Sequence, residues 1–179
     1  MEANRAERVY LALVAPLEDK MIRMIVRIVA APHAAEDVLQ DVLATIWRKL
    51  PRLERHANPH AYVLRICLSC SVDHLRRQRK RREIVLASEP EYSGMGPSDT
   101  LIAREATETV QGAICRLPPK QAQAVLLRAL QNCSYGEIGE ALGCSHDTAR
   151  SHFSKGIARV RDILNRSSDV RHEETPNER

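Results

Sequence analysis

The stretch from Ser134 to Val160 constrains the fold most, because local signals for two helices follow one another in it. Ser134 and Glu137 have the spacing of a capping box, in which a hydroxyl and a carboxylate bond the backbone reciprocally at a helix start. Gly143 supplies the left-handed residue that ends such a helix, and Ser145 can cap the next helix. The pattern predicts two helices joined by a glycine-containing turn, which is a helix-turn-helix.

The second of these helices is amphipathic and carries an apolar stripe at helical spacing: Ala149, Phe153, Ile157, Val160 and Leu164. Its outward face offers donors for phosphates and base edges: Arg150, Ser151, His152 and Lys155. An ordinary helical hairpin with a solvated basic face is the alternative. Two caps, a glycine turn and a donor-rich face together favour DNA binding.

Composition favours an all-α fold for the 179 residues, because aromatic residues make up only 3% and a β-sandwich or barrel needs more. The net charge of +4 is modest but clustered, which favours a polyanionic partner. No apolar run is long enough to cross a bilayer, and the N-terminus lacks the apolar core of a signal peptide. Five cysteines without a regular framework favour a reducing compartment. We therefore expect a cytoplasmic protein with no membrane insertion.

The first half predicts three helical regions. Over residues 2–31, Pro16 either begins a second helix or kinks a continuous one. The next helix, over residues 35–50, is expected to bury six side chains: Leu39, Val42, Leu43, Ile46, Trp47 and Leu50. Its other face gathers Asp37, Gln40 and Asp41, either as a binding face or as a complement to the helix dipole.

A long helix over residues 60–82 follows a loop that is bounded by Pro51 and Pro59. It ends in a run from His74 to Arg82, in which six of nine residues are Arg or Lys. Such a run is usually a solvated face. Its density is costly in self-repulsion, however, and this favours binding to nucleic acid.

Residues 87–100 contain prolines, glycines and serines without periodicity, which is typical of a flexible linker. We therefore expect an all-α protein of two small helical domains, over residues 1–84 and 100–166, with a linker over 85–99 and a disordered tail over 167–179. The second domain is expected to begin with a helix that turns Val110 inward and ends before Pro118.

Cys67, Cys70 and His74 share one flank of the long helix and could hold a metal ion or sense oxidation. A fourth ligand is not evident, and free cysteine is commonly a small buried hydrophobe. We therefore expect no metal and no cofactor. Cys115, Cys133 and Cys144 are interpreted as helix-packing residues.

In their order and spacing, these segments resemble the extracytoplasmic-function (ECF) class of bacterial RNA polymerase sigma factors, over roughly residues 5–165. Residues 35–50 are similar to the polymerase-binding helix of that family, and residues 61–77 to its promoter-opening helix. Residues 117–121 and 134–151 are similar to its domain that binds the upstream promoter element.

The resemblance implies a role for each candidate residue. Asp37, Gln40 and Asp41 would grip a coiled coil of the largest polymerase subunit. Five basic residues would meet the promoter backbone near the start site: Arg76, Arg77, Arg79, Lys80 and Arg81. Asn58, His60 and Tyr62 would capture bases of the melted −10 region. The alternative roles are helix capping for Asn58 and core packing for Tyr62. The four outward residues from Arg150 to Lys155 would read the −35 element in the major groove. Core RNA polymerase, promoter DNA and an anti-sigma factor are the expected partners.

Two departures from the family pattern lie in the second helix of the helix-turn-helix, which is called the recognition helix below. His152 and Lys155 replace frequent arginines, and lysine lacks the fork that reads guanine. Gly156 replaces a frequent alanine, so the helix is expected to be looser by about 1 kcal/mol. The rival function is a free-standing helix-turn-helix regulator that never joins polymerase. The sequence has no glycine-rich phosphate loop and no nucleophile elbow, so we expect no enzyme.

Overall fold

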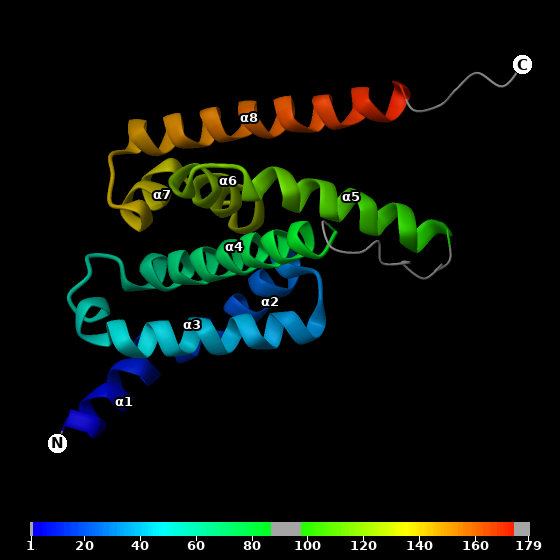
Figure 1. Ribbon diagram of the computed structural model, residues 1–179. Coiled ribbons are helices and arrows are strands. Elements are labelled where there is room, and N and C mark those ends of the chain that lie inside the picture. Colours follow the sequence, from blue (N-terminus) through cyan, green and yellow to red (C-terminus); the bar gives the residue numbers. More distant parts are fainter. Residues whose placement is uncertain (1, 87–97, 174–179) are drawn as a thin grey trace, which may run out of the picture.

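The computed structural model describes residues 2–86 and 98–173, and the side-chain surroundings of residues 4–84 and 104–166. Within these ranges the fold is helical throughout, which confirms the all-α prediction (Figure 1). Most of the predicted linker and the end of the predicted tail lie outside the described residues. Among the described residues, no helix combines the length and the apolarity that crossing a membrane requires.

The first half consists of four α-helices and a short 3-10 turn. These elements are α1 (Glu2–Leu13), η1 (Ala15–Leu17), α2 (Glu18–Val29), α3 (Pro32–Leu53) and α4 (Pro59–Leu86). Pro16 lies in η1, so the chain does break into two helices there. Met21, Met24 and Ile25 of α2 are almost completely buried and pack in the core that α2, α3 and α4 enclose.

The third helix departs from the expected pattern at two places. It continues through Pro51 to Leu53, and Leu53 is completely buried, although Pro51 has no N–H to donate to the carbonyl four residues before it. The prediction that Trp47 is buried was wrong. Its side chain is 53% exposed and lies against Tyr10 of α1, with ring centroids 6.1 Å apart.

The second half consists of α5 (Ser98–Cys115), α6 (Pro119–Gln131), α7 (Tyr135–Leu142) and α8 (His146–Glu173). The predicted capping box is present, since Ser134 Oγ accepts from the Glu137 amide at 3.2 Å and the Ser134 amide donates to the Glu137 carboxylate at 2.7 Å. Gly143 adopts the left-handed conformation with φ 63°, and Ser145 caps α8. The helix-turn-helix is therefore confirmed. Helix α8 continues beyond the predicted boundary at residue 166.

Two glycines allow helices of the second half to approach closely. A Cβ at Gly139 would lie 2.7 Å from the Cys144 carbonyl oxygen in the turn. A Cβ at Gly156 would lie 2.6 Å from Cγ2 of Val125, where α8 crosses α6. The expectation of a looser recognition helix is therefore corrected, because Gly156 is buried and permits tight packing.

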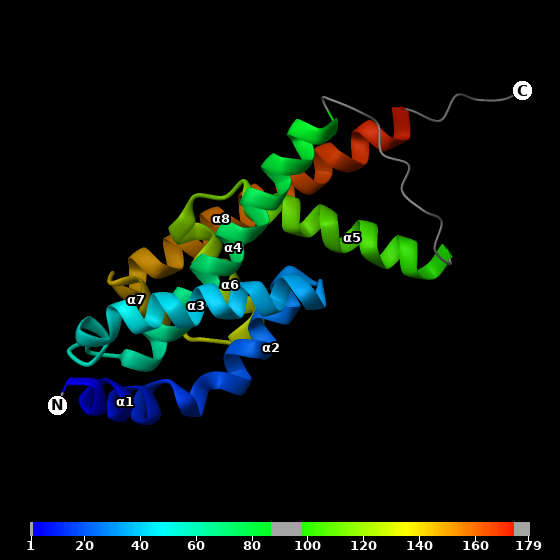
Figure 2. The same cartoon turned by 60° about the horizontal axis from the view of Figure 1, so that its bottom comes forward.

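The two halves pack against each other across α4 (Figures 1 and 2). Helix α4 contacts α2 and α3 on one side and α5, α6 and α7 on the other. Leu75 of α4 and Ile114 and Leu117 of the second half are buried in one continuous apolar core. In the described structure the chain therefore forms a closed arrangement, with α4 as its central helix.

Candidate functional site

The face of α3 predicted to bind polymerase is on the surface. Asp37, Gln40 and Asp41 are exposed, and the buried side of the same helix carries Val38 and Val42. The helix thus divides its faces as the sequence pattern predicts. Two carboxylates on an exposed helix can steer a cationic partner into place.

Asp41 is also linked to the basic end of α4. Arg77 donates to its carboxylate at 3.1 Å, and both side chains are more than half exposed. Solvent screens such a pair, so it contributes little to stability and either partner can leave it readily. The predicted polymerase and promoter surfaces are therefore adjacent at this point.

His74 lies between these surfaces without a hydrogen bond at its buried Nε2 atom. Burial lowers its pKa, and the charge of Arg77 adds to the effect, while Asp37 and Asp41 oppose it. Burial also raises the pKa of the Cys67 and Cys70 thiols. Protonated thiols are poor ligands and poor nucleophiles. In the part of the chain that the structure describes, no three metal-binding side chains gather at one point.

The residues proposed to capture bases lie at the start of α4 and have different surroundings. Asn58 caps the helix, because its Oδ1 accepts from the Ala61 amide at 3.0 Å, and its amide donates to Glu140 of α7. His60 is exposed. Tyr62 is only 1% exposed, with its ring 4.7 Å from the His56 ring, so stacking on a base would require it to move.

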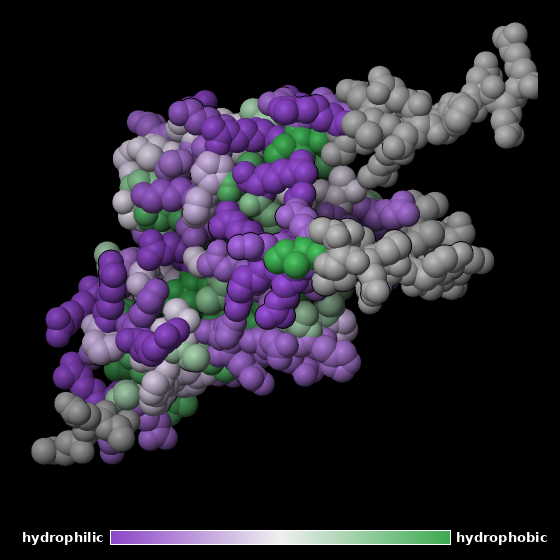
Figure 3. All heavy atoms as spheres, in the orientation of Figure 1, coloured by the Kyte–Doolittle hydropathy of each residue, from purple (hydrophilic) through white to green (hydrophobic). Residues whose placement is uncertain are grey.

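The basic end of α4 divides into two groups, although the sequence analysis treated it as one. Arg77, Lys80 and Arg81 are exposed to solvent. Arg76 and Arg79 point toward the second half and donate to backbone carbonyls at the end of α5. Figure 3 shows that hydrophilic side chains cover much of the described surface on the face drawn.

The recognition helix presents its predicted donors outward. Arg150, Ser151 and Lys155 are exposed, and His152 is half-buried. Ala149 is completely buried on the opposite side. Four side chains predicted to face DNA therefore share one end of α8, next to the turn.

Several residues that position this helix have no strong local signal. Tyr135 lies edge-on to the His146 ring at 5.7 Å and near Phe153, and Arg128 lies over its ring. Arg159 donates to the nearly buried Gln121 at 3.0 Å and so ties α8 to α6. Of these residues, helical spacing singles out only the two aromatics Tyr135 and Phe153.

Models of two families match the chain in the order of its two halves. The model described as sigma-70 region 2 matches residues 13–81. The model described as sigma-70, region 4, matches residues 107–160. The first match spans the exposed acidic face and the basic helix, and the second spans the helix-turn-helix.

Curated relatives are similar in sequence along most of the chain. The ECF RNA polymerase sigma factor SigW of Bacillus subtilis is 22% identical over 157 residues, which are 82% of this chain and 84% of that protein. The RNA polymerase sigma-E factor of Streptomyces coelicolor is 29% identical over 148 residues, which are 82% of this chain and 81% of that protein. Among solved structures, CnrH in complex with the cytosolic domain of CnrY has a similar fold, with a TM-score of 0.53 and 18% sequence identity. The match covers 91% of this chain and 94% of that chain.

Proposed function

We propose that this chain, which belongs to the ECF class of the sigma-70 family of RNA polymerase sigma factors, docks on core polymerase through Asp37, Gln40 and Asp41. The observation that supports this best is the exposure of all three side chains on a helix whose other face is buried. The region 2 match includes the helix from end to end. Carboxylates placed in this way give both steering and specificity toward a basic partner surface.

The second half reads duplex promoter DNA in this proposal. The first turns of α8 enter the major groove of the −35 element, with Arg150, Ser151, His152 and Lys155 toward the bases and phosphates. The proposed domains are residues 1–84 and 100–166, which the linker over 85–99 joins. Such a linker lets the two domains reach two promoter elements at once.

The first half opens the promoter and holds one strand. Arg77, Lys80 and Arg81 are exposed for phosphates near the start site, and Arg76 and Arg79 join them once freed from α5. His60 is free to meet an unstacked base, while Asn58 and Tyr62 contribute after leaving Glu140 and His56.

An anti-sigma factor is the proposed regulator, and the cytoplasm the proposed location. CnrH, to which the fold is similar, was solved in complex with the cytosolic domain of CnrY. A partner that covers the α3 face or α8 would block polymerase or DNA, and the two surfaces lie on one closed molecule.

Run-off transcription with core polymerase on a library of genomic fragments tests the function. The full chain is expected to select a small set of templates, whose common upstream sequence defines the promoter. If the chain binds DNA alone and neither binds core polymerase nor stimulates it, it is a free-standing regulator instead.

The docking face is tested by the variant Asp37→Lys/Asp41→Lys. Affinity for core polymerase is expected to fall on the order of thirtyfold, since a charge pair is replaced by like charges. The matched control is Glu7→Lys/Asp19→Lys, which makes the same charge change at exposed positions of α1 and α2 and is expected to retain binding. Equal losses in both variants would assign the effect to net charge and refute the docking face.

A further inference from the structure

Two arginines of α4 cap the carboxyl end of a helix in the other half. Arg76 donates through Nε to the Cys115 carbonyl at 3.1 Å and through Nη2 to the Leu117 carbonyl at 2.8 Å. Arg79 donates through Nη1 to the Gly112 carbonyl at 3.2 Å. The last carbonyls of a helix lack intrahelical partners and carry partial negative charge, so guanidinium groups suit them.

The capping is reciprocal. Gln111 of α5 donates through Nε2 to the Ile28 and Val29 carbonyls, at 2.8 and 3.1 Å, at the end of α2. Gln123 of α6 donates to the Ser69 hydroxyl of α4 at 2.7 Å. These two neutral amides therefore hold the second half against the first without contributing any charge.

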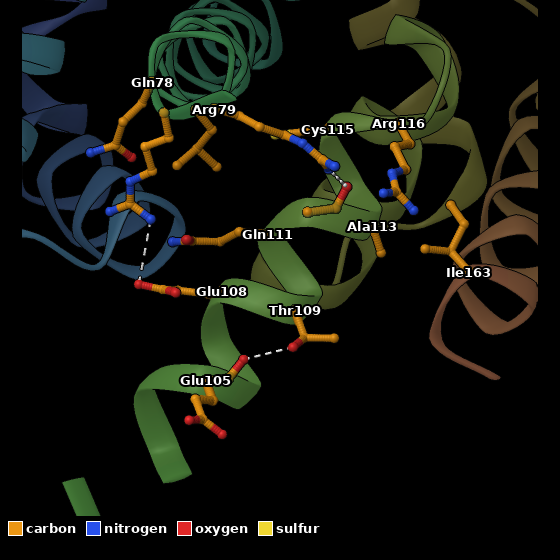
Figure 4. A pocket seen from close by; sticks show the side chains of 13 residues that line it. Gln78, Arg79, Glu105, Glu108, Thr109, Gln111, Ala113, Cys115, Arg116 and Ile163 are labelled. Carbon is orange, nitrogen blue, oxygen red and sulfur yellow. Dashed lines mark hydrogen bonds and ion pairs between the residues drawn. The ribbon is translucent and has the colours of Figure 1, made fainter. Parts of the chain in front are cut away.

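Beside these contacts the two halves leave an open cavity of about 610 Å³ (Figure 4). Arg79 and Arg82 of α4 and Glu105 and Glu108 of α5 are among its lining residues, and Arg82 lies 3.5 Å from the Glu108 carboxylate. Polar, incompletely packed surfaces are typical of domain contacts that separate. The contact around Arg79 is therefore suited to opening.

In the closed chain these arginines direct donors to the protein itself that could otherwise bind phosphates. Arg76 uses all three guanidinium nitrogens, because Nη1 lies 3.3 Å from Asp73 while the other two donate to carbonyls. Arg79 divides its donors between Glu83 and the Gly112 carbonyl. A phosphate can take over the donors that now point to these carbonyls only if the carbonyls move away.

We propose that Arg76 and Arg79 exchange partners, from the carboxyl end of α5 in the closed chain to nucleic-acid phosphates when the halves separate. This inference rests on the proposed function, in which α4 meets promoter DNA. The closed chain withholds two phosphate contacts, and Gln111 and Gln123 are the latches that keep it closed.

The test is the full-length variant Gln111→Ala/Gln123→Ala, which keeps every charge. Binding of fluorescein-labelled single-stranded oligo-dT is followed by anisotropy over a range of salt concentrations, and the radius of gyration by small-angle X-ray scattering. We expect a larger radius, tighter binding, and a log–log salt slope steeper by about 1.4, because each phosphate contact on a single strand contributes about 0.7. The exposed amide variant Asn165→Ala is the control, and we expect it to bind like the unaltered chain.

Adding Arg76→Gln/Arg79→Gln to the open variant is expected to remove the gain. A gain that persists without the arginines refutes the exchange. If the variant opens but binds no tighter, the exchange is refuted. If the variant stays compact and binds no tighter, the role of the two glutamines as latches is refuted. Run-off transcription by the unaltered chain with core polymerase reports separately on the proposed function, so either conclusion can fail alone.

Discussion

At the scale of single residues, Gly156 decides how closely the recognition helix approaches the helix beneath it. Cγ2 of Val125 fills the space for a side chain there. Valine is branched at Cβ, so its side chain cannot rotate away easily. Gly156→Ala is expected to lower the free energy of unfolding by about 1–3 kcal/mol, the usual cost of overpacking. Urea denaturation, monitored by circular dichroism, measures this change in the free energy of unfolding.

The control for that prediction is Gly136→Ala in α7. A Cβ there has the Ser134 hydroxyl as its nearest neighbour at 3.8 Å, an ordinary contact. This variant is expected to be neutral or stabilised, since alanine favours helix. The double variant Gly156→Ala/Val125→Ala is expected to cost less than the sum of its single changes. Strict additivity would contradict the proposed clash.

The capping box gives a second prediction at this scale. Hydrogen bonds from Ser134 lower the pKa of the Glu137 carboxyl group. Its contribution to stability is therefore present above the ordinary pKa of an unfolded glutamate and is lost as the pH falls through the lowered folded value. Glu137→Gln is expected to reduce the acid-dependent fall of the thermal midpoint, and Ser134→Ala is expected to cost about 1 kcal/mol at neutral pH. An unchanged acid profile in the glutamine variant would exclude this role.

At the scale of elements, one side-chain pair bridges the joint between α1 and α2. The Tyr10 hydroxyl donates to the Glu18 carboxylate at 2.5 Å, and burial, with help from Glu18, raises the pKa of Tyr10 to about 12. The stability from this bond is present below the ordinary tyrosine pKa and is lost as the pH rises toward about 12. Spectrophotometric titration is expected to show a late ionisation step from Tyr10. Tyr10→Phe should abolish that late step, and a late step that survives in it belongs to another residue.

Elements with local signals could be predicted from the sequence, and tertiary orientations could not. The capping box at Ser134 and the left-handed Gly143 are determined within one or two turns of chain, so the helix-turn-helix followed from them. The burial of Tyr62, the exposure of Trp47 and the inward direction of Arg76 depend on which helix lies opposite. Helical periodicity places a side chain on a face but does not say which neighbour covers that face.

Val110 and the acidic face illustrate the same division. The stripe of α5 predicted Val110 inside, but it is 48% exposed on a helix that packs against both α4 and α8. Asp37 and Asp41 were predicted on the surface and lie there, since a charged face next to a continuous apolar stripe leaves few alternatives.

At the scale of the whole molecule, the continuous core predicts coupled unfolding of the two halves. Trp47 is the only tryptophan and reports on the first half alone, whereas circular dichroism reports on all helices. The two probes are expected to give one coincident urea transition in the unaltered chain. In Gln111→Ala/Gln123→Ala they are expected to separate. Two transitions in the unaltered chain would show that the halves are independent.

The acceptors for Arg76 and Arg79 are main-chain oxygens of residues 112, 115 and 117. Every amino acid supplies the same oxygen, so replacing the side chains at these positions leaves the acceptor atoms in place. Substitutions at positions 115 and 117 would therefore leave this contact unnoticed, whereas a Cβ at Gly112 would already lie 3.4 Å from Nη1 of Arg79. The contact is altered by changes to the arginines, by changes to the backbone that aims the oxygens, or by a side chain at position 112 that displaces Arg79.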